Sequence, residues 1–176
     1  MPATLGNLET LIRENIVRAV EHVFQTMLEN MPPIVALSKE VRDPTGAPFY
    51  SQAHRTAHVV GNVGFTGKAN GMVYIHFPLP LARLCTCTLL GMTPAELEAA
   101  GEDSVNDAVG EFTNMIVGNF KNGFCDFGFP CTLTMPSILR GTDFSIQAVS
   151  SSIRRMHAFE CAGHLLVADV HLKMEE

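Results

Sequence analysis

The chain has 176 residues, of which 47% are hydrophobic and 17% are charged, and its formal net charge is −6 at pH 7. This length fits a single domain over residues 1–176 with a core of its own, and the composition excludes a disordered chain. The negative charge argues against nucleic acid as a partner, and no apolar run approaches the roughly 20 residues that span a membrane.

The first predicted element is a long helix. Apolar residues recur at three- and four-residue steps from about residue 7 to residue 31, which predicts an amphipathic helix. Asn7 fits as its N-cap, and the paired prolines that follow end it. Residues 34–41 read as a strand, and the turn-rich segment 42–54 reads as an exposed loop.

A hairpin and a short helix come next. Two β-rich runs within residues 58–77 are joined by a turn around residues 67–71, which predicts a β-hairpin. Residues 79–92 are expected to form a short helix that starts at a proline and ends at Gly91. The acidic stretch 93–103 is interpreted as a linker.

A second long helix and more strands complete the chain. Helical periodicity extends from about residue 103 to residue 124. The β-rich segments after it are residues 132–139, 144–149, 152–161 and 164–174. This order of elements, two similar halves in succession, predicts an α+β domain whose long helices cover one face of a largely antiparallel sheet.

The polar side of the second long helix carries an unusual set of residues. At roughly 100° per residue, one narrow stripe contains Asp107, Glu111, Asn114, Gly118 and Lys121. Glu111 and Asn114 are i, i+3 neighbours, so both side chains can contact the same external object. Glycine inside a helix costs about 1 kcal/mol relative to alanine, and Gly118 leaves room for a partner to approach. The alternative is a solvated face without a special purpose.

The sequence around this stripe, DAVGEFTNMIVGNFKNGF, resembles the signature helix of the CheC/CheX/FliY family of phosphatases. The shared pattern is an acidic residue, three positions, Glu, two positions, Asn, and then Met-Ile and Gly-Asn. It is matched by Asp107, Glu111, Asn114, Met115, Ile116, Gly118, Asn119 and Lys121. VGFTGKANGMVYIHF resembles the first hairpin of the family, and LTMPSILRG resembles the strand after the signature helix. The likeness is closest to CheX, because the chain has one Glu-x-x-Asn motif where CheC proteins have two.

The resemblance implies a fold and a reaction. The fold is a pseudo-duplicated, CheC-like arrangement of two long helices on one face of a six-stranded antiparallel sheet, in a homodimer formed through sheet edges. The reaction is hydrolysis of the aspartyl phosphate of a CheY-type response-regulator receiver domain in chemotaxis or a related pathway. No cofactor of its own is expected, because the receiver supplies Mg²⁺.

The resemblance also implies roles for the stripe. Asn114 would hold the attacking water, as the glutamine of small GTPases does. Glu111 would pair with the active-site lysine of the receiver and anchor the helix. Gly118 would allow close approach, and Asp107 and Lys121 would contact the partner.

Two other classes of function compete with this hypothesis. A non-catalytic receiver-binding or flagellar-switch adaptor would dock with the same helix face, but it has no need of the carboxamide of Asn114. A small-molecule hydrolase with a zinc site is the third alternative. No Walker-type phosphate loop and no serine nucleophile elbow occur in the sequence.

Two groups of residues have spacings that metal ligands use. His54 and His58 are four apart, but they lie where a loop enters a strand and have no third ligand nearby, so a solvated loop is favoured. Strand alternation places His157 and Cys161 on one face, near His164, and ordinary packing is favoured there too. No metal site is therefore expected.

The cysteines and the N-terminus bear on the compartment. Five cysteines are an odd number at irregular spacings, which does not fit a disulfide framework. The N-terminal sequence lacks the basic start and apolar segment of a signal peptide, and we expect a reduced, cytoplasmic protein. Cys85 and Cys87 are interpreted as small core residues rather than a redox pair. Arg154 and Arg155 are expected to be solvated strand residues.

Overall fold

The computed structural model describes residues 5–37, 57–142, 146–148 and 151–174. Its helices are α1 (Leu5–Met27), α2 (Leu79–Leu90), α3 (Pro94–Ala100) and α4 (Glu102–Asp126). Its strands are β1 (Val35–Ala36), β2 (His58–Gly67), β3 (Ala69–Pro78), β4 (Cys131–Leu133), β5 (Ser137–Gly141), β6 (Ile153–Cys161) and β7 (His164–Met174).

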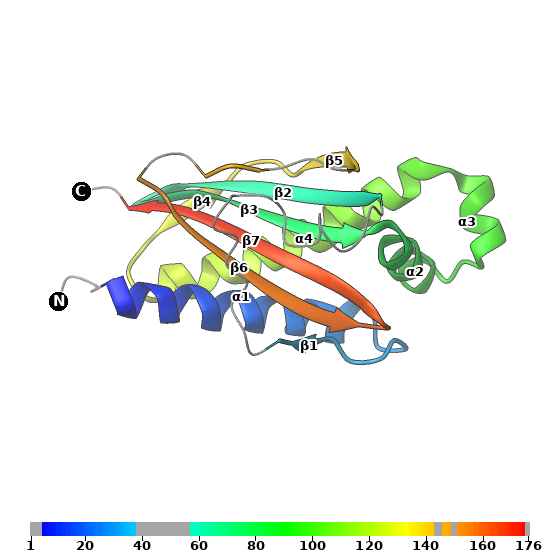
Figure 1. Ribbon diagram of the computed structural model, residues 1–176, viewed down its shortest axis with the longest axis horizontal. Coiled ribbons are helices and arrows are strands. Elements are labelled where there is room, and N and C mark those ends of the chain that lie inside the picture. Colours follow the sequence, from blue (N-terminus) through cyan, green and yellow to red (C-terminus); the bar gives the residue numbers. More distant parts are fainter. Residues whose placement is uncertain (1–4, 38–56, 143–145, 149–150, 175–176) are drawn as a thin grey trace.

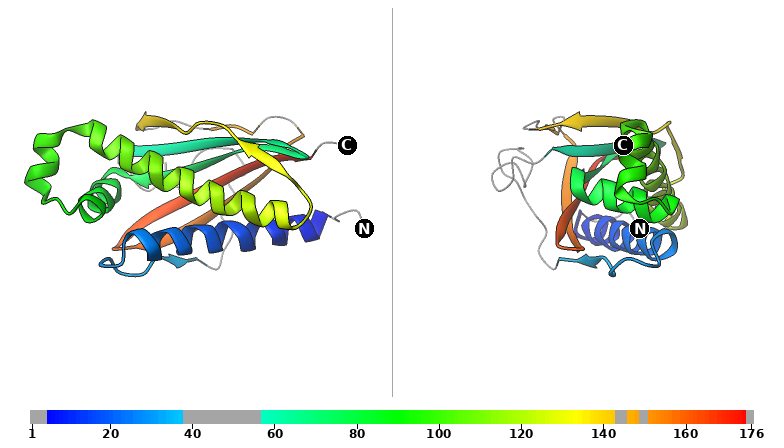
Figure 2. Two further views of the ribbon diagram at one scale, coloured as in Figure 1. Left: turned by 180° about the vertical axis from the view of Figure 1, so that it is seen from behind. Right: turned by 90° about the vertical axis from the view of Figure 1, so that its right-hand side faces the viewer.

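The described strands form one sheet in the order β1-β6-β7-β3-β2-β4, with β5 also on the outer edge of β2. All pairings are antiparallel. The long helices α1 and α4 lie side by side on one face of this sheet and run in opposite directions (Figures 1 and 2). The predicted α+β class, with two long helices on one face of an antiparallel sheet, is confirmed.

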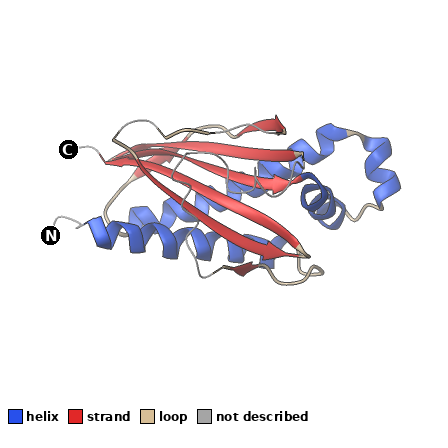
Figure 3. Cartoon of the chain, in the orientation of Figure 1, coloured by secondary structure: helices blue, strands red, loops and turns tan. Residues whose placement is uncertain are grey.

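The number of strands differs from the expected six, because seven are described. The segment 132–139 forms two short strands, β4 and β5, which follow the same edge of β2 one after the other (Figure 3). Pro136 lies between them and has no backbone N–H to give to a ladder, which favours a break at this point. The strand predicted at 144–149 is wrong for residues 146–148, which are irregular, and its other residues lie outside the described ranges.

Three further predictions about the helices were wrong. The stretch 93–103 is not a linker but contains α3, which Thr93 and Glu96 begin with a reciprocal capping box. Helix α1 ends at Met27 rather than near residue 31: Leu28 donates to the carbonyl of Phe24, and the N–H of Met31 then bonds to the carbonyl of Leu28 in a turn instead of continuing the helix. It also begins at Leu5, so Asn7 lies inside the first turn and is not its N-cap.

The core lies between the sheet and the two long helices. Phe24 of α1 stacks on Phe77 of β3 and on Phe112 of α4, with ring centroids 6.2 and 5.9 Å apart. Further along α4, Phe120 packs on Phe65 of β2. Aromatic pairs at these separations add to the free energy of burial. The two helices and the sheet therefore share one hydrophobic core, and α4 cannot rotate without disturbing it.

Candidate functional site

The predicted stripe lies on the outward side of α4. Asp107, Glu111 and Asn114 are exposed, whereas Gly118 and Lys121 are half-buried. The opposite side of the helix is buried on the sheet and on α1. No other described element covers the outward side (Figure 2). Because α4 is one continuous helix, the five residues follow one line on an open surface.

A close approach between α4 and the sheet sets the rotation of this helix. Thr113 is fully buried over Gly61 of β2, and its hydroxyl donates a hydrogen bond of 2.7 Å to the carbonyl of Val109. A side-chain carbon at position 61 would lie 2.8 Å from Cβ of Thr113, and closer still to its Oγ1. The absence of a side chain at Gly61 therefore lets Thr113 face the sheet, and Asn114 is turned about 100° away from it.

Strand β5 holds the first turns of α4. Arg140 donates a hydrogen bond of 2.6 Å from Nη1 to Oδ1 of Asn106, and its Nη2 is 3.1 Å from Oε1 of Glu102. These contacts lie one and five residues before Asp107 and hold the part of α4 where the stripe starts. Arg140 was missed from the sequence because its partners are 34 and 38 positions away. The only sequence feature that could have drawn attention to Arg140 is its position before Gly141 in the segment LTMPSILRG.

Gly118 has space around it. A side-chain carbon added there would meet no atom within 4 Å outside its own helix and chain neighbours, so packing does not require glycine at this position. The helix nevertheless forgoes about 1 kcal/mol of helical propensity there. Close approach of a binding partner to the helix backbone would account for glycine at position 118.

The stripe presents a carboxylate and a carboxamide on an exposed helix face. The amide of Asn114 can donate a hydrogen bond and accept one, and Glu111 one turn earlier supplies an acceptor for a cation. Neither residue lines the pocket beside α2 and α3 or the two pockets beside α1. A small molecule on such a surface would stay largely solvated, whereas small-molecule sites are concave. The geometry therefore suits a macromolecular partner that brings its own reactive group.

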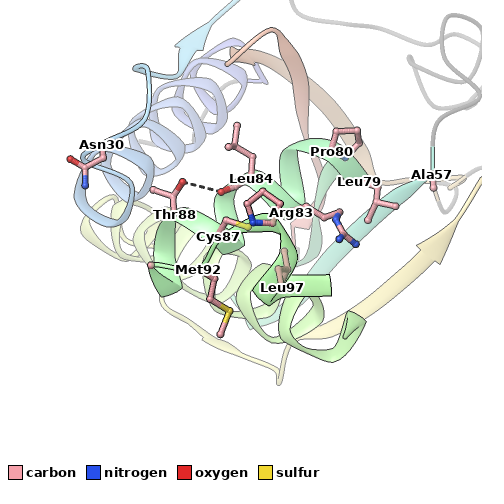
Figure 4. A pocket seen from close by; sticks show the side chains of 12 residues that line it. Asn30, Ala57, Leu79, Pro80, Arg83, Leu84, Cys87, Thr88, Met92 and Leu97 are labelled. Carbon is pink, nitrogen blue, oxygen red and sulfur yellow. Dashed lines mark hydrogen bonds between the residues drawn. The ribbon is translucent and has the colours of Figure 1, made fainter. Parts of the chain in front are cut away.

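A large pocket lies elsewhere, between α2, α3 and the chain just before β2. It has a volume of about 1130 Å³ and an apolar lining that includes Leu79, Leu84 and Met92 (Figure 4). Thr88 uses its hydroxyl for a hydrogen bond to the carbonyl of Leu84, and Arg83 is paired with Glu98. Thr88 and Arg83 are thus engaged within the protein, and no histidine or carboxylate is among the described lining residues to activate the thiol of Cys87.

Two of the histidines with ligand-like spacings, His58 and His157, are buried in the sheet. His58 is buried in β2 rather than solvated, and His54 lies outside the described residues. His157 and Cys161 are both buried, while His164 is half-buried. Within the described ranges, no group of three or more His, Cys, Asp and Glu side chains is arranged to hold a metal ion.

The expectation that Arg154 and Arg155 are solvated was wrong. Arg154 donates hydrogen bonds of 3.0 and 2.8 Å to the carboxylate of fully buried Asp169, and Arg155 pairs with Glu9 of α1. Burial alone raises the pKa of Asp169, but hydrogen bonds from His171 and Arg154 outweigh it and hold this pKa below its ordinary value. Both arginines thus neutralise carboxylates inside the fold.

The cysteines are unpaired, and the helices are not of the membrane-spanning kind in the part of the chain that the structure describes. All five cysteines are free thiols, and Cys85 belongs to the hydrophobic core, as predicted. Cys87 is half-buried and packs against that core. Among the described residues, no helix combines the length and apolar character that crossing a membrane requires.

Comparison with known proteins gives a family and a fold. Residues 59–160 match the family described as chemotaxis phosphatase CheX. No curated protein matches the chain.

Several solved structures are similar to the whole chain. A chemotaxis protein CheX from Desulfovibrio desulfuricans is 22% identical, with a TM-score of 0.75 over 93% of this chain and 99% of that one. A CheX-CheY-BeF₃-Mg²⁺ complex from Borrelia burgdorferi is 19% identical, with a TM-score of 0.68 over 92% and 97%. FliY from Thermotoga maritima is 14% identical, with a TM-score of 0.62 over 99% and 92%. At these identities the likeness establishes the shared fold.

Proposed function

The chain belongs to the CheX family of chemotaxis phosphatases, as its signature helix predicts, and from this we propose that it hydrolyses the aspartyl phosphate of a CheY-type receiver domain. One observation carries the proposal: Glu111 and Asn114 are exposed one turn apart on an uncovered face of α4. The CheX structure from Borrelia burgdorferi was solved in complex with CheY, BeF₃ and Mg²⁺, which supports a receiver as the partner.

The proposed reaction requires little of this chain beyond positioning a water molecule. An aspartyl phosphate is an activated acyl phosphate, and phosphoryl transfer depends mainly on positioning and electrostatics. Asn114 would hold one water in line with the scissile bond by accepting a hydrogen bond from it and donating one to it. The chain needs no metal of its own in this scheme, because the receiver brings Mg²⁺ to its phosphorylated aspartate.

Glu111 has a different role in the proposal. A carboxylate next to a phosphoryl group would repel it, so Glu111 is a poor general base. It would instead pair with the active-site lysine of the receiver, a charge-assisted contact that docks α4 and places Asn114 over the phosphate. Asp107 and Lys121 would contact the receiver at either end of the stripe, and Gly118 would let the receiver approach the helix backbone.

The proposal includes a cellular location. Receiver domains act in the cytoplasm, so a protein that dephosphorylates one would be cytoplasmic too. A homodimer through sheet edges also stays a prediction; the short strands β1 and β5 are edges at which a second copy could add.

The test is the decay of a CheY-type receiver phosphorylated with acetyl phosphate. Substoichiometric wild-type protein should accelerate the decay. Asn114→Ala should slow it by about 100-fold or more while leaving binding intact, and Glu111→Ala should weaken binding and turnover together. Asn122→Ala is the matched control, because Asn122 is an exposed asparagine of α4 that lies two turns beyond Asn114 and is rotated about 80° from it.

The same assay separates the enzyme from the adaptor. An adaptor would bind the phosphorylated receiver and leave its decay unchanged or slower. Full activity of Asn114→Ala would refute the water-positioning role, and no acceleration with any receiver tested would refute the proposed phosphatase.

A further inference from the structure

One apolar side chain stands out beside the stripe. Met135 is 88% exposed, the highest value among the exposed large hydrophobic residues of the described chain. Scattered exposed apolar residues are ordinary on protein surfaces, so its position and its support decide whether it has a purpose.

The turn that carries Met135 is held firmly. Thr134 donates its backbone N–H to the carbonyl of Gly64 at 2.8 Å, and its Oγ1 accepts the N–H of Gly64 at 2.9 Å. Pro136 follows Met135 and restricts the backbone before it. The backbone of the turn is thereby ordered before any partner arrives, which lowers the entropy cost of binding through it.

Contacts with α4 show where this turn lies along the axis of the helix. The chain from β4 to β5 follows the edge of β2 beside α4, and Ile138 lies opposite Gly110 (Figure 2). At the other end, Leu133 pairs with Phe65, which packs on Phe120 of α4. Along the axis of α4, residues 134–136 therefore lie between Gly110 and Phe120. Asn114 and Gly118 occupy the same part of the helix.

The angular position is also adjacent to the stripe. The side of α4 that faces β5 carries Asn106 and Gly110. On a helix of 3.6 residues per turn, this side borders directly on the side of Asn114 and Lys121. Met135 thus stands at the flank of the stripe, next to helix positions that carry glycine.

We infer that Met135 is a docking residue, which inserts into an apolar surface patch of the receiver beside its phosphorylated aspartate. The inference rests on the proposed function and extends its interface from α4 to the turn between β4 and β5. Methionine suits the role, because its flexible thioether adapts to a partner and it is enriched in protein interfaces. The stripe supplies the polar centre of the interface, and Met135 supplies an apolar anchor at its flank.

The test compares three variants at Met135 with one control, using the full chain and a phosphorylated receiver that the wild-type protein dephosphorylates. Met135→Ala should raise KM about tenfold with kcat unchanged, Met135→Glu should raise it further, and Met135→Leu should stay near wild type. The control is Leu139→Ala. Leu139 is 43% exposed on β5, where alternation directs it away from the face that Ile138 and Arg140 use to contact α4.

The outcomes separate this inference from the proposed function. An unchanged KM for Met135→Ala and Met135→Glu, or a fall in kcat alone, overturns the docking role and leaves the phosphatase proposal standing. Equal effects of Met135→Ala and Leu139→Ala also overturn it. If the wild-type chain neither binds nor dephosphorylates any receiver, the proposed function fails and the inference fails with it.

Discussion

A single methyl group at Gly61 should disturb the candidate site from the opposite side of α4. In Gly61→Ala the new carbon would lie 2.8 Å from Cβ of Thr113, where ordinary contact begins at 3.4 Å, and its clash with Oγ1 would be worse. Strand β2 is paired on both sides at this position, with Ile75 and Ile138, so it cannot move aside. Helix α4 must therefore lift by at least about 0.6 Å, and overpacking of this kind costs about 1–3 kcal/mol.

Urea unfolding measures the stability of this variant, and a double-mutant cycle tests its cause. Thr113→Ala removes Oγ1 and Cγ2, two of the three clashing atoms, so the double variant should be more stable than the sum of the single effects by about 1 kcal/mol or more. Gly110→Ala is the control, because a carbon there would meet only Cδ1 of Ile138, at 3.9 Å. It should not destabilise the protein.

The activity of Gly61→Ala should also fall, because Asn114 moves with α4. A misplacement of about 1 Å can cost about 100-fold in rate, and the loss should appear in kcat under conditions where the variant is folded. The reasoning is refuted if Gly61→Ala unfolds within about 0.5 kcal/mol of wild type, or if Thr113→Ala gives no relief. Either result would mean that this crossing does not set the position of the helix.

Three further changes test other parts of the structure. Gly118→Ala should raise stability by about 1 kcal/mol in thermal unfolding, yet weaken the docking of a receiver, measured as a higher KM. Arg154→Met should cost about 3–5 kcal/mol in urea unfolding at pH 7, because it strips a direct partner from the buried carboxylate of Asp169. Burial, with two arginines nearby, lowers the pKa of His157 to about 4, so below pH 6.5 the unfolded chain binds a proton that the folded chain does not. The free energy of unfolding should fall by roughly 3 kcal/mol between pH 6.5 and pH 4 from this residue, and urea titrations should show a shallower fall for His157→Leu.

Periodicity alone placed the helix that carries the site, because α4 is long and its two sides differ in polarity. The same periodicity aligned Glu111 with Asn114, and the structure leaves both exposed. Local composition was a poorer guide for α3, where the acidic character of the stretch suggested a linker. The Thr93–Glu96 capping box was a readable helix signal there.

Features that depend on register could not be read from the sequence. Arg154 and Arg155 looked like solvent-exposed charges, but their carboxylate partners are 15 and 146 positions away. The hydrogen bond from Arg140 to Asn106 likewise depends on the pairing of β5 with the edge of β2, which the local sequence pattern does not specify. Long-range pairing decides which charges a fold buries, and a single sequence shows only the charges themselves.

The exposure of the site on a helix face has a consequence for specificity. A pocket selects its ligand by enclosing it, but Glu111 and Asn114 lie exposed on the outward side of α4, so in the proposed reaction the partner would supply both the phosphate and the walls around it. What α4 contributes is a fixed spacing between Glu111 and Asn114, made rigid because Thr113 between them is fully buried. The buried side of the helix therefore controls the exposed side, and a substitution at Gly61 that touches no partner should change turnover as surely as one at Glu111.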